Sequence, residues 1–469
     1  MGLSERWAAD ALVIFGITGD LARKMTFPAL YRLERRGALT CPVIGIAPDP
    51  LTTDELAQRA RQAIADSGEP LDEAVFSRLA RRLTYLAGDA TDTQLYKSLA
   101  VQLSGARRPL YYLEVPPSLF APIVDRLDAF GLLGDARVAV EKPFGQDLAS
   151  ARELGARLGQ VLDQQQLLLV DHFLAKEPVI EIEYLRFANV AMADLWHRVS
   201  VEAIQMTMAE DFGVGDRGGF YDTTGALRDV VQNHLLQVLA LVTMDPPIGP
   251  SADDLRDKKA EALKAVLPAD PQHCVRGQYE GYQQVQGVAQ GSDTETFVAL
   301  RLDIDSWPWA TVPVFIRAGK QLPVRDTEVR LMLRHTPRLR FLPDAARVEG
   351  NQIVLRIAPD PGLRLQLSGL DEKMAWRPVR LDTEFAHELG EPQAPYERLL
   401  YDALNGDDRL FARQDAVEES WRILQPLVAY PPPARPYAVG TWGPPEADAL
   451  VSGYPKWQQP WLHEPPSRS

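Results

Sequence analysis

Residues 11–24 read ALVIFGITGDLARK. The five apolar residues 11–15 are typical of a buried strand, and Gly16 and Gly19 follow them directly, ahead of a stretch that can form a helix. Glycines in such a turn let backbone amides approach a pyrophosphate, whose charge the N-terminal end of a helix stabilises. The stretch therefore predicts the first strand, the phosphate turn and the first helix of a dinucleotide-binding domain.

The turn lacks the full GxGxxG pattern, because its spacing is GxxGDLA and an alanine stands where strand and helix pack closely. A glycine-rich turn alone is a weak signal, but its place after the first strand of a βαβ series favours a dinucleotide site. The residues expected to contact the cofactor here are Gly16, Thr18, Gly19, Asp20, Leu21, Ala22 and Arg23.

Further apolar runs alternate with helical patterns up to about residue 176. The predicted strands cover residues 42–47, 83–88, 110–115, 136–142 and 167–173. Between most of them lie segments with helical spacing, such as 28–37, which Gly37 is expected to end. Strict alternation of strand and helix predicts a doubly wound parallel sheet, so residues 1–176 are expected to form an α/β Rossmann-type domain.

The pattern changes after about residue 180. Apolar residues alternate in 196–211, which predicts an antiparallel strand with one buried face. Similar strands are expected at 297–305, 312–319, 328–335, 352–359 and 363–369, and helices at 176–189, 226–244, 252–267 and 396–427. The proline-rich stretch 431–436 is expected to be a rigid surface connection. Strands and helices in groups predict an α+β domain over 177–469 with a large, mainly antiparallel sheet.

Length and charge limit the function. A chain of 469 residues exceeds the roughly 250–300 residues of a single core, which favours two domains. The formal net charge of −14 disfavours nucleic acid or an anionic membrane as the main partner, so an anionic substrate needs a local basic cluster. Cys41 and Cys274 have no CxxC partner, and the sequence shows no secretory signal or membrane-spanning run. We expect a cytoplasmic protein.

The end of the second predicted strand bears on the choice of cofactor. Ala47, Pro48 and Asp49 stand where an acidic group usually accepts from a ribose 2′-hydroxyl, or an arginine pairs with a 2′-phosphate. Pro48 offers no positive charge and Asp49 would repel a phosphate. These residues alone favour NAD over NADP.

Ordered motifs along nearly the whole chain resemble the glucose-6-phosphate 1-dehydrogenase family. They include FGITGDLARK (15–24), EKPFGQDLASA (141–151), DHFLAKE (171–177), RGGFYDTTGALRDVVQNHLLQ (217–237) and YERLLYDAL (396–404). The resemblance implies oxidation of β-D-glucose 6-phosphate to 6-phosphoglucono-δ-lactone, with hydride passing from C1 to NADP or NAD and no metal.

The resemblance also implies the proton-transfer residues. His234 in QNHLLQ would be the base that takes the 1-hydroxyl proton, and Asp171 the carboxylate that orients it. A neutral imidazole suits this role, because its pKa lies near the working pH and a carboxylate can stabilise the imidazolium. By spacing alone, His234 on an apolar helix is more typical of a hydrogen-bonded core histidine.

Other matches to the family imply substrate contacts. His172 and Lys176 would bind the phosphate of glucose 6-phosphate, and Lys142 would lie between the sugar and the nicotinamide, contacting both. Pro143 is expected to follow a cis peptide bond. The remaining implied contacts are Glu210 and Asp229 for sugar hydroxyls, and Lys320 and Arg325 for further parts of the substrate.

Some residues depart from the family pattern. Phe173 and Ala175 change the usual DHYLGKE, which removes a tyrosine hydroxyl from the phosphate site, and Met25 shortens a basic triplet. Pro48 replaces the usual arginine, so use of both NADP and NAD is expected. Two alternatives remain at this point: a family member without turnover that serves as a binding or assembly partner, and another Rossmann sugar oxidoreductase. A homodimer or homotetramer is expected, since a large sheet with helices on one face often pairs its other face.

Overall fold

The computed structural model describes residues 7–336, 350–373, 375–390 and 392–461, and these divide into two compact units. The first unit comprises residues up to Lys176 together with 247–257 and 393–418, and the second comprises 177–246, 258–392 and 419 onward. The domains expected from the sequence, 1–176 and 177–469, place both inserted segments, 247–257 and 393–418, in the second domain. The two units are described separately below.

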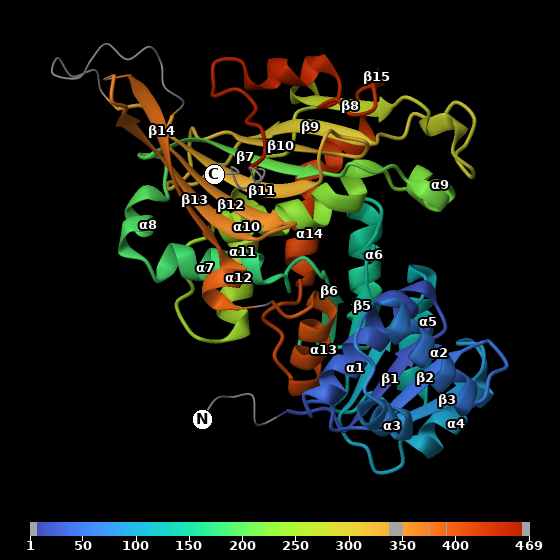
Figure 1. Cartoon of the computed structure of the whole chain (residues 1–469). Coiled ribbons are helices and arrows are strands. Elements are labelled where there is room, and N and C mark those ends of the chain that lie inside the picture. Colours follow the sequence, from blue (N-terminus) through green and yellow to red (C-terminus); the bar gives the residue numbers. More distant parts are fainter. Residues whose placement is uncertain (1–6, 337–349, 374, 391, 462–469) are drawn as a thin grey trace. The chain divides into compact units, whose positions relative to one another are not determined.

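The first unit contains a six-stranded parallel sheet with the strand order β3-β2-β1-β4-β5-β6 (Figure 1). Its strands are β1 (Ala11–Phe15), β2 (Val43–Ala47), β3 (Leu83–Ala87), β4 (Pro109–Leu113), β5 (Arg137–Glu141) and β6 (Leu167–Val170). This order is that of a doubly wound dinucleotide-binding sheet, which confirms the predicted Rossmann-type fold. The carboxyl ends of β1 and β4 are neighbours, and ligands bind at such a position in open α/β sheets.

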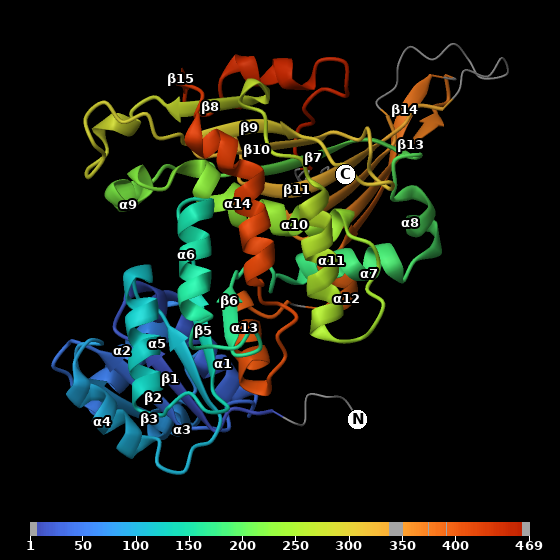
Figure 2. The ribbon, with the colours of Figure 1, turned by 180° about the vertical axis from the view of Figure 1, so that it is seen from behind.

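Helices cover both faces of this sheet (Figures 1 and 2). They are η2 (Ala22–Thr26), α1 (Phe27–Arg35), α2 (Thr53–Asp66), α3 (Glu73–Arg82), α4 (Thr93–Gln102), α5 (Phe120–Ala129), α6 (Leu148–Leu158) and α13 (Pro395–Asn405). Local sequence sets several helix ends: Thr52 and Glu55 form a capping box on α2, and Gly37 has a φ of 69° just after α1. Tyr396 and Leu400 of α13 belong to the apolar core of this unit, which explains why a segment so late in the chain joins it.

The second unit contains a nine-stranded sheet with the order β14-β13-β12-β11-β7-β10-β9-β8-β15. Its strands are β7 (Val201–Ala209), β8 (Cys274–Tyr279), β9 (Phe297–Leu302), β10 (Val314–Gly319), β11 (Asp326–Leu333), β12 (Gln352–Ala358), β13 (Gly362–Leu370), β14 (Trp376–Glu384) and β15 (Ala434–Tyr437). Neighbouring strands are antiparallel except for β7 with β10 and β8 with β15. The predicted large, mainly antiparallel sheet is therefore confirmed.

The helices of this unit include α7 (Glu177–Phe187), α8 (Val190–Leu195), α9 (Gly218–Asp222), η5 (Leu227–Leu235), α10 (Leu236–Thr243) and α12 (Phe385–Leu389). The helices α11 (Ala252–Ala265) and α14 (Gln414–Ala429) each begin in the first unit and continue in the second. Gly406, with a φ of 76°, ends α13 and divides the single helical stretch expected at 396–427. No helix among the described residues is both long enough and apolar enough to cross a bilayer.

One expectation from the sequence is wrong in this unit, and another is confirmed in part. Strand β7 is buried on both faces, although its alternation of apolar and polar residues predicted one buried face. Its polar side chains have partners inside the protein: Gln205 donates to the carbonyl of Pro455 at 2.9 Å, and Thr207 accepts from Arg317 at 3.0 Å. The stretch 431–436 lies at the surface as expected, and residues 431–433 belong to no helix or strand, but from Ala434 the chain forms β15, which pairs with β8.

Candidate active-site residues

The predicted phosphate turn begins with a glycine that no other residue can replace without strain. Gly16 has a φ of 86°, and a Cβ atom built on it would lie 2.2 Å from the carbonyl oxygen of Glu114. The amide of Gly19 donates to the Gly16 carbonyl at 2.9 Å, and that of Arg23 donates to the Gly19 carbonyl at 3.1 Å, where the helix starts. The chain thus turns sharply from β1 into η2, as a phosphate-binding turn requires.

The predicted cofactor residues of the phosphate turn contact the one that follows β2, within the first unit. Thr18 donates a hydrogen bond of 2.6 Å to the carboxylate of Asp49, which links the turn to the end of β2. Asp20 pairs with Arg23 at 3.3 Å and with Lys24 at 3.4 Å on the surface. The hydrogen bond from Arg23, followed by that from Lys24, lowers the pKa of Asp20. Asp49 therefore lies beside the turn, where it can accept from a ribose.

The end of β6 presents Asp171, His172 and Lys176. Asp171 is buried and accepts a hydrogen bond of 3.0 Å from the amide of Phe173, which holds its carboxylate at the start of the loop. The imidazole of His172 stacks on the ring of Tyr396 at 5.7 Å, and the Lys176 ammonium lies 3.8 Å from the centre of the Phe173 ring. Both basic side chains thus rest on aromatic rings that limit their freedom.

The segment after β5 holds Lys142. The peptide bond between Lys142 and Pro143 is cis, which confirms the conformation expected for this proline. Glu141, just before it, is buried and accepts a hydrogen bond of 2.6 Å from Tyr112, and burial raises the pKa of Glu141 to about 7. Lys142 directly follows β5 and so lies at the carboxyl end of the parallel sheet.

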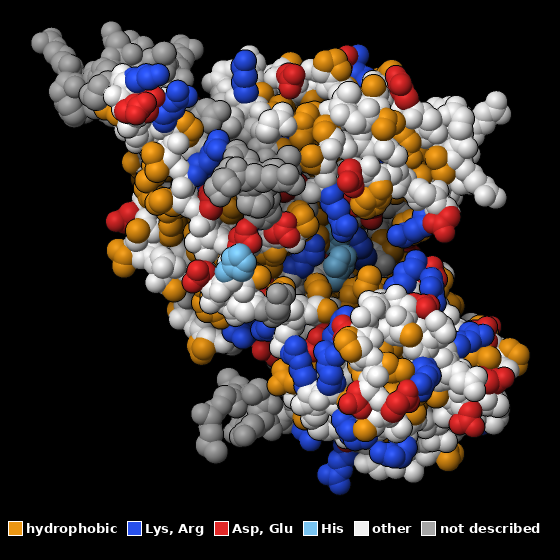
Figure 3. All heavy atoms as spheres, viewed as in Figure 1, with side chains coloured by type: hydrophobic (Ala, Val, Ile, Leu, Met, Phe, Trp, Pro, Cys, Tyr) orange, Lys and Arg blue, Asp and Glu red, His pale blue; other side chains and the backbone are white. Residues whose placement is uncertain are grey.

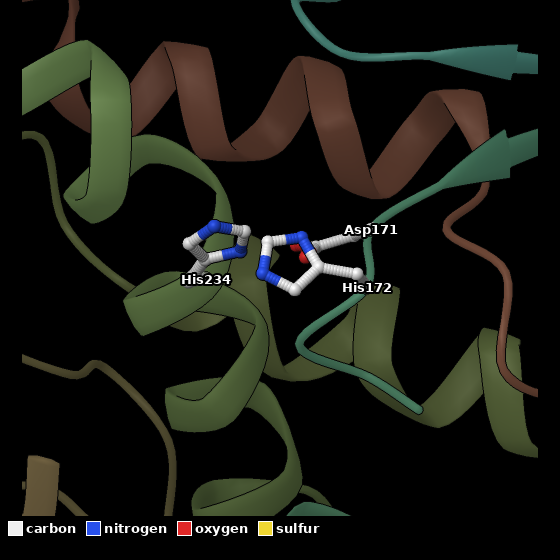
Figure 4. A group of neighbouring side chains, drawn as sticks. All are labelled: Asp171, His172 and His234. Carbon is white, nitrogen blue, oxygen red and sulfur yellow. The ribbon is translucent and has the colours of Figure 1, made fainter. Parts of the chain in front are cut away.

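His234 lies in the second unit on η5, a π-helical segment (Figure 4). Its side chain is buried, and its backbone amide donates a hydrogen bond of 2.6 Å to the side-chain oxygen of Asn233. Segments of π-helix are rare and frequently occur at functional sites. Figure 4 also shows Asp171 and His172 at the end of β6 in the first unit.

Glu210 and Lys320 form an ion pair within the second unit. They directly follow β7 and β10, whose parallel pairing brings the two ends together, and the Lys320 ammonium lies 2.5 Å from the Glu210 carboxylate. Lys320 also lies 5.3 Å from the ring of Phe212 and 5.1 Å from that of Tyr221. The pair combines an ammonium group, which can donate hydrogen bonds to a phosphate, with a carboxylate, which can accept them from hydroxyl groups.

Arg325 and Asp229 approach the same two rings. The guanidinium of Arg325 lies 5.8 Å from the centre of the Phe212 ring. Burial raises the pKa of Tyr221 well above its ordinary value, and the charges of Asp229, Glu295 and Glu210 add to this effect. The rings of Phe212 and Tyr221 thus lie near the four residues of this unit that the sequence implied as substrate contacts, Glu210, Asp229, Lys320 and Arg325.

Comparison with known proteins identifies the family. A model of the glucose-6-phosphate dehydrogenase NAD-binding domain matches residues 13–181, and a model of the C-terminal domain of the same enzyme matches 183–458. The chain belongs to the glucose-6-phosphate dehydrogenase family. Its first unit therefore contains an NAD(P)-binding domain, and the chain is an oxidoreductase of this family and not another Rossmann sugar oxidoreductase.

Individual relatives agree with this family. The glucose-6-phosphate 1-dehydrogenases 1 of Mycobacterium tuberculosis and Mycobacterium bovis are each 62% identical over 455 residues, which cover 97% of this chain and 97% of theirs. A crystal structure of glucose-6-phosphate 1-dehydrogenase from Mycobacterium avium matches 97% of this chain and 100% of that chain with a TM-score of 0.92 and 61% identity. The structure of a glucose-6-phosphate dehydrogenase in complex with its substrate glucose 6-phosphate also matches 97% of this chain and 100% of that chain. Its TM-score is 0.90 and its sequence identity is 31%.

Three aromatic residues beside the family's motif positions were not singled out from the sequence. Tyr396 supports His172, while Phe212 and Tyr221 lie next to Lys320. Tyr221 lies within RGGFYD and Tyr396 begins YERLLYDAL, so the motifs that carry the family resemblance contain two of them. No local periodicity separates these rings from ordinary core aromatics.

Proposed function

We propose that this chain oxidises D-glucose 6-phosphate to 6-phospho-D-glucono-1,5-lactone, the first step of the pentose phosphate pathway, with His234 as the base. The hydride leaves C1 for the nicotinamide while the imidazole accepts the proton of the 1-hydroxyl group. The family match along both domains supports this proposal most strongly. Asp171 would orient the imidazole, as the family resemblance implies.

We assign substrate binding to residues of the first unit and to residues of the second unit. In the first unit His172 and Lys176 would take the phosphate, and Lys142 would contact the sugar and the cofactor. In the second unit Glu210 and Asp229 would accept hydrogen bonds from sugar hydroxyls, and Lys320 and Arg325 would add positive charge. The aromatic rings beside His172, Lys176 and Lys320 favour these roles, because side chains that are already held in place lose less entropy on binding.

Absorbance of the reduced nicotinamide, followed with glucose 6-phosphate and each cofactor, tests the reaction directly. A family member that serves only as a binding or assembly partner would bind glucose 6-phosphate and form no reduced cofactor. Turnover with glucose 6-phosphate is the expected result. The cytoplasmic location expected from the sequence stays a prediction, as do the domain boundaries at 1–176 and 177–469.

For the cofactor we propose use of both NADP and NAD. The carboxylate of Asp49 accepts from Thr18 and lies beside the turn, which suits a ribose with two free hydroxyl groups. Pro48 is exposed and brings no charge to a 2′-phosphate, whereas Arg23 is exposed on the first turn of the helix and long enough to do so. These opposed features predict comparable use of the two cofactors.

Replacing Pro48 by arginine is expected to shift the ratio of kcat/KM toward NADP by about tenfold to a hundredfold, because a guanidinium can pair with the 2′-phosphate. Steady-state kinetics with both cofactors measure the shift. Pro48→Met is the control, since it lengthens the side chain without adding charge. A wild type that already prefers NADP by more than about a hundredfold, roughly 2.7 kcal/mol, would show that charges elsewhere decide the preference.

For the assembly we propose a homodimer or homotetramer that pairs through β13 and β14. These strands end the nine-stranded sheet, and Leu367, Val379 and Leu381 share one face of them and are more than two-fifths exposed. Hydrophobic side chains gather over this end of the second unit (Figure 3). A second copy of the same chain would cover such a patch symmetrically.

An aspartate at position 381 is expected to weaken this assembly. Leu381 is 54% exposed, so Leu381→Asp leaves the core of the subunit intact while placing a charge in the apolar patch. Light scattering after size exclusion should show a smaller mass at low concentration. The control is Ile248→Asp, which puts the same charge on another exposed apolar residue. Equal masses for both variants and the wild type would argue against this interface.

A further inference from the structure

Glu114 is a carboxylic acid beside the phosphate turn to which the proposed reaction gives no role. It follows β4, and its amide donates a hydrogen bond of 2.9 Å to the carbonyl of Phe15, the last residue of β1. Its own carbonyl oxygen lies so close to Gly16 that only a glycine fits there. The main chain of Glu114 is thus in contact with the first residue of the turn.

The side chain of Glu114 connects β4 to the helix that follows the turn. Its Oε1 accepts a hydrogen bond from the hydroxyl of Thr26, which is fully buried at the end of η2. Its Oε2 is buried and has no hydrogen-bond partner among the described residues. An ionised carboxylate in this position would lack most of the hydration and pairing that stabilise its charge.

Among the described residues, the charge that acts on Glu114 is negative and not positive. Glu141 at the end of β5 is its charged neighbour, and Tyr112 of β4 and Tyr396 of α13 both hydrogen-bond to Glu141. Burial raises the pKa of Glu114 to about 8, the Thr26 hydroxyl partly opposes this rise, and the charge of Glu141 adds to it. Glu114 is therefore neutral over most of the physiological range and ionises just above it.

We propose that Glu114 is a positioning residue for the dinucleotide. As a neutral acid it holds η2 against the end of β4, so that the turn keeps the shape that a pyrophosphate needs. On ionisation it places a negative charge directly behind the turn and weakens binding of the anionic cofactor. This role rests on the proposed cofactor site at Gly16–Ala22. It adds that the affinity of this site for the dinucleotide depends on pH.

The experiment measures the dissociation constants of NADH and NADPH by fluorescence titration of the intact protein across about pH 6.5–9.5. The variant is Glu114→Gln, which keeps the shape of the side chain and cannot ionise. The matched control is Glu153→Gln, which removes an exposed carboxylate from α6 in the same unit. Thermal unfolding at each pH shows that all three proteins are folded.

In the wild type and in Glu153→Gln, the dissociation constants are expected to rise about tenfold between pH 7 and pH 9, the effect of a like charge that shifts a pKa by about one unit. In Glu114→Gln the dissociation constants should rise at most about threefold over this range, because only the ionisation of Glu141 still adds negative charge near the turn. Parallel profiles of the wild type and Glu114→Gln, with good binding at pH 7, would overturn the inference alone. No binding by the wild type at pH 7 would overturn the cofactor site and this inference with it.

A second variant tests the role of Glu114 if Glu114→Gln does not fold. Thr26→Val removes the hydroxyl that stabilises the ionised carboxylate and preserves the volume of the side chain. The pH at which cofactor binding weakens should therefore move upward by about half a unit or more. An unchanged profile in Thr26→Val would contradict the role of Glu114.

Discussion

Replacement of His234 by asparagine is expected to lower kcat by about 10²–10⁴, because the variant loses the general base that accepts the proton of the 1-hydroxyl group. Asparagine approximates the shape of the imidazole and can hydrogen-bond, but it takes up no proton at neutral pH. Affinity for glucose 6-phosphate should change little, since the base acts in the transition state and not in ground-state binding. Stopped-flow measurement of the hydride-transfer step, together with substrate titration, separates these effects.

His273→Asn provides the matched control for this variant. His273 is an exposed histidine of the second unit, where it lies 3.7 Å from Asp270, and its loss should leave kcat unchanged. Because His234 is buried, thermal unfolding of both variants is needed to separate loss of chemistry from loss of fold. A His234→Asn enzyme that is folded and has near-normal kcat would remove the assignment of the base.

Removal of the Lys176 side chain as Lys176→Ala is expected to raise KM for glucose 6-phosphate by about tenfold to a hundredfold. A charge-assisted hydrogen bond to a phosphate contributes about 1.5–3 kcal/mol, and the proposed contact of His172 with the phosphate would remain in the variant. The kinetic constants for unphosphorylated glucose should change little, since glucose carries no phosphate. Steady-state kinetics with both substrates give the comparison.

The control for this prediction is Lys97→Ala, which removes an exposed ammonium from α4 in the same unit and should affect neither substrate. The ring of Phe173 beneath the Lys176 ammonium stays in place in both variants. Equal losses with glucose and glucose 6-phosphate in Lys176→Ala would show that Lys176 supports the fold or the chemistry and does not select the phosphate.

The local features of this protein could be predicted from its sequence. Alternating strands and helices predicted the parallel sheet, and the glycines after β1 predicted the sharp turn, because each of these signals lies within a few residues. Helix ends at Gly37 and the capping box at Thr52 follow from equally local chemistry. The chemical roles came from longer motifs whose resemblance to a family covers both units.

Only the tertiary structure decided which distant residues meet. Glu210 and Lys320 are 110 positions apart, and they form an ion pair because β7 and β10 run parallel and end together. Tyr396 lies beneath His172 because α13 returns to the core of the first unit. The polar face of β7 is buried because later residues of the chain cover it. Sequence periodicity records which side chains share a face of one element, whereas long-range packing determines what covers that face.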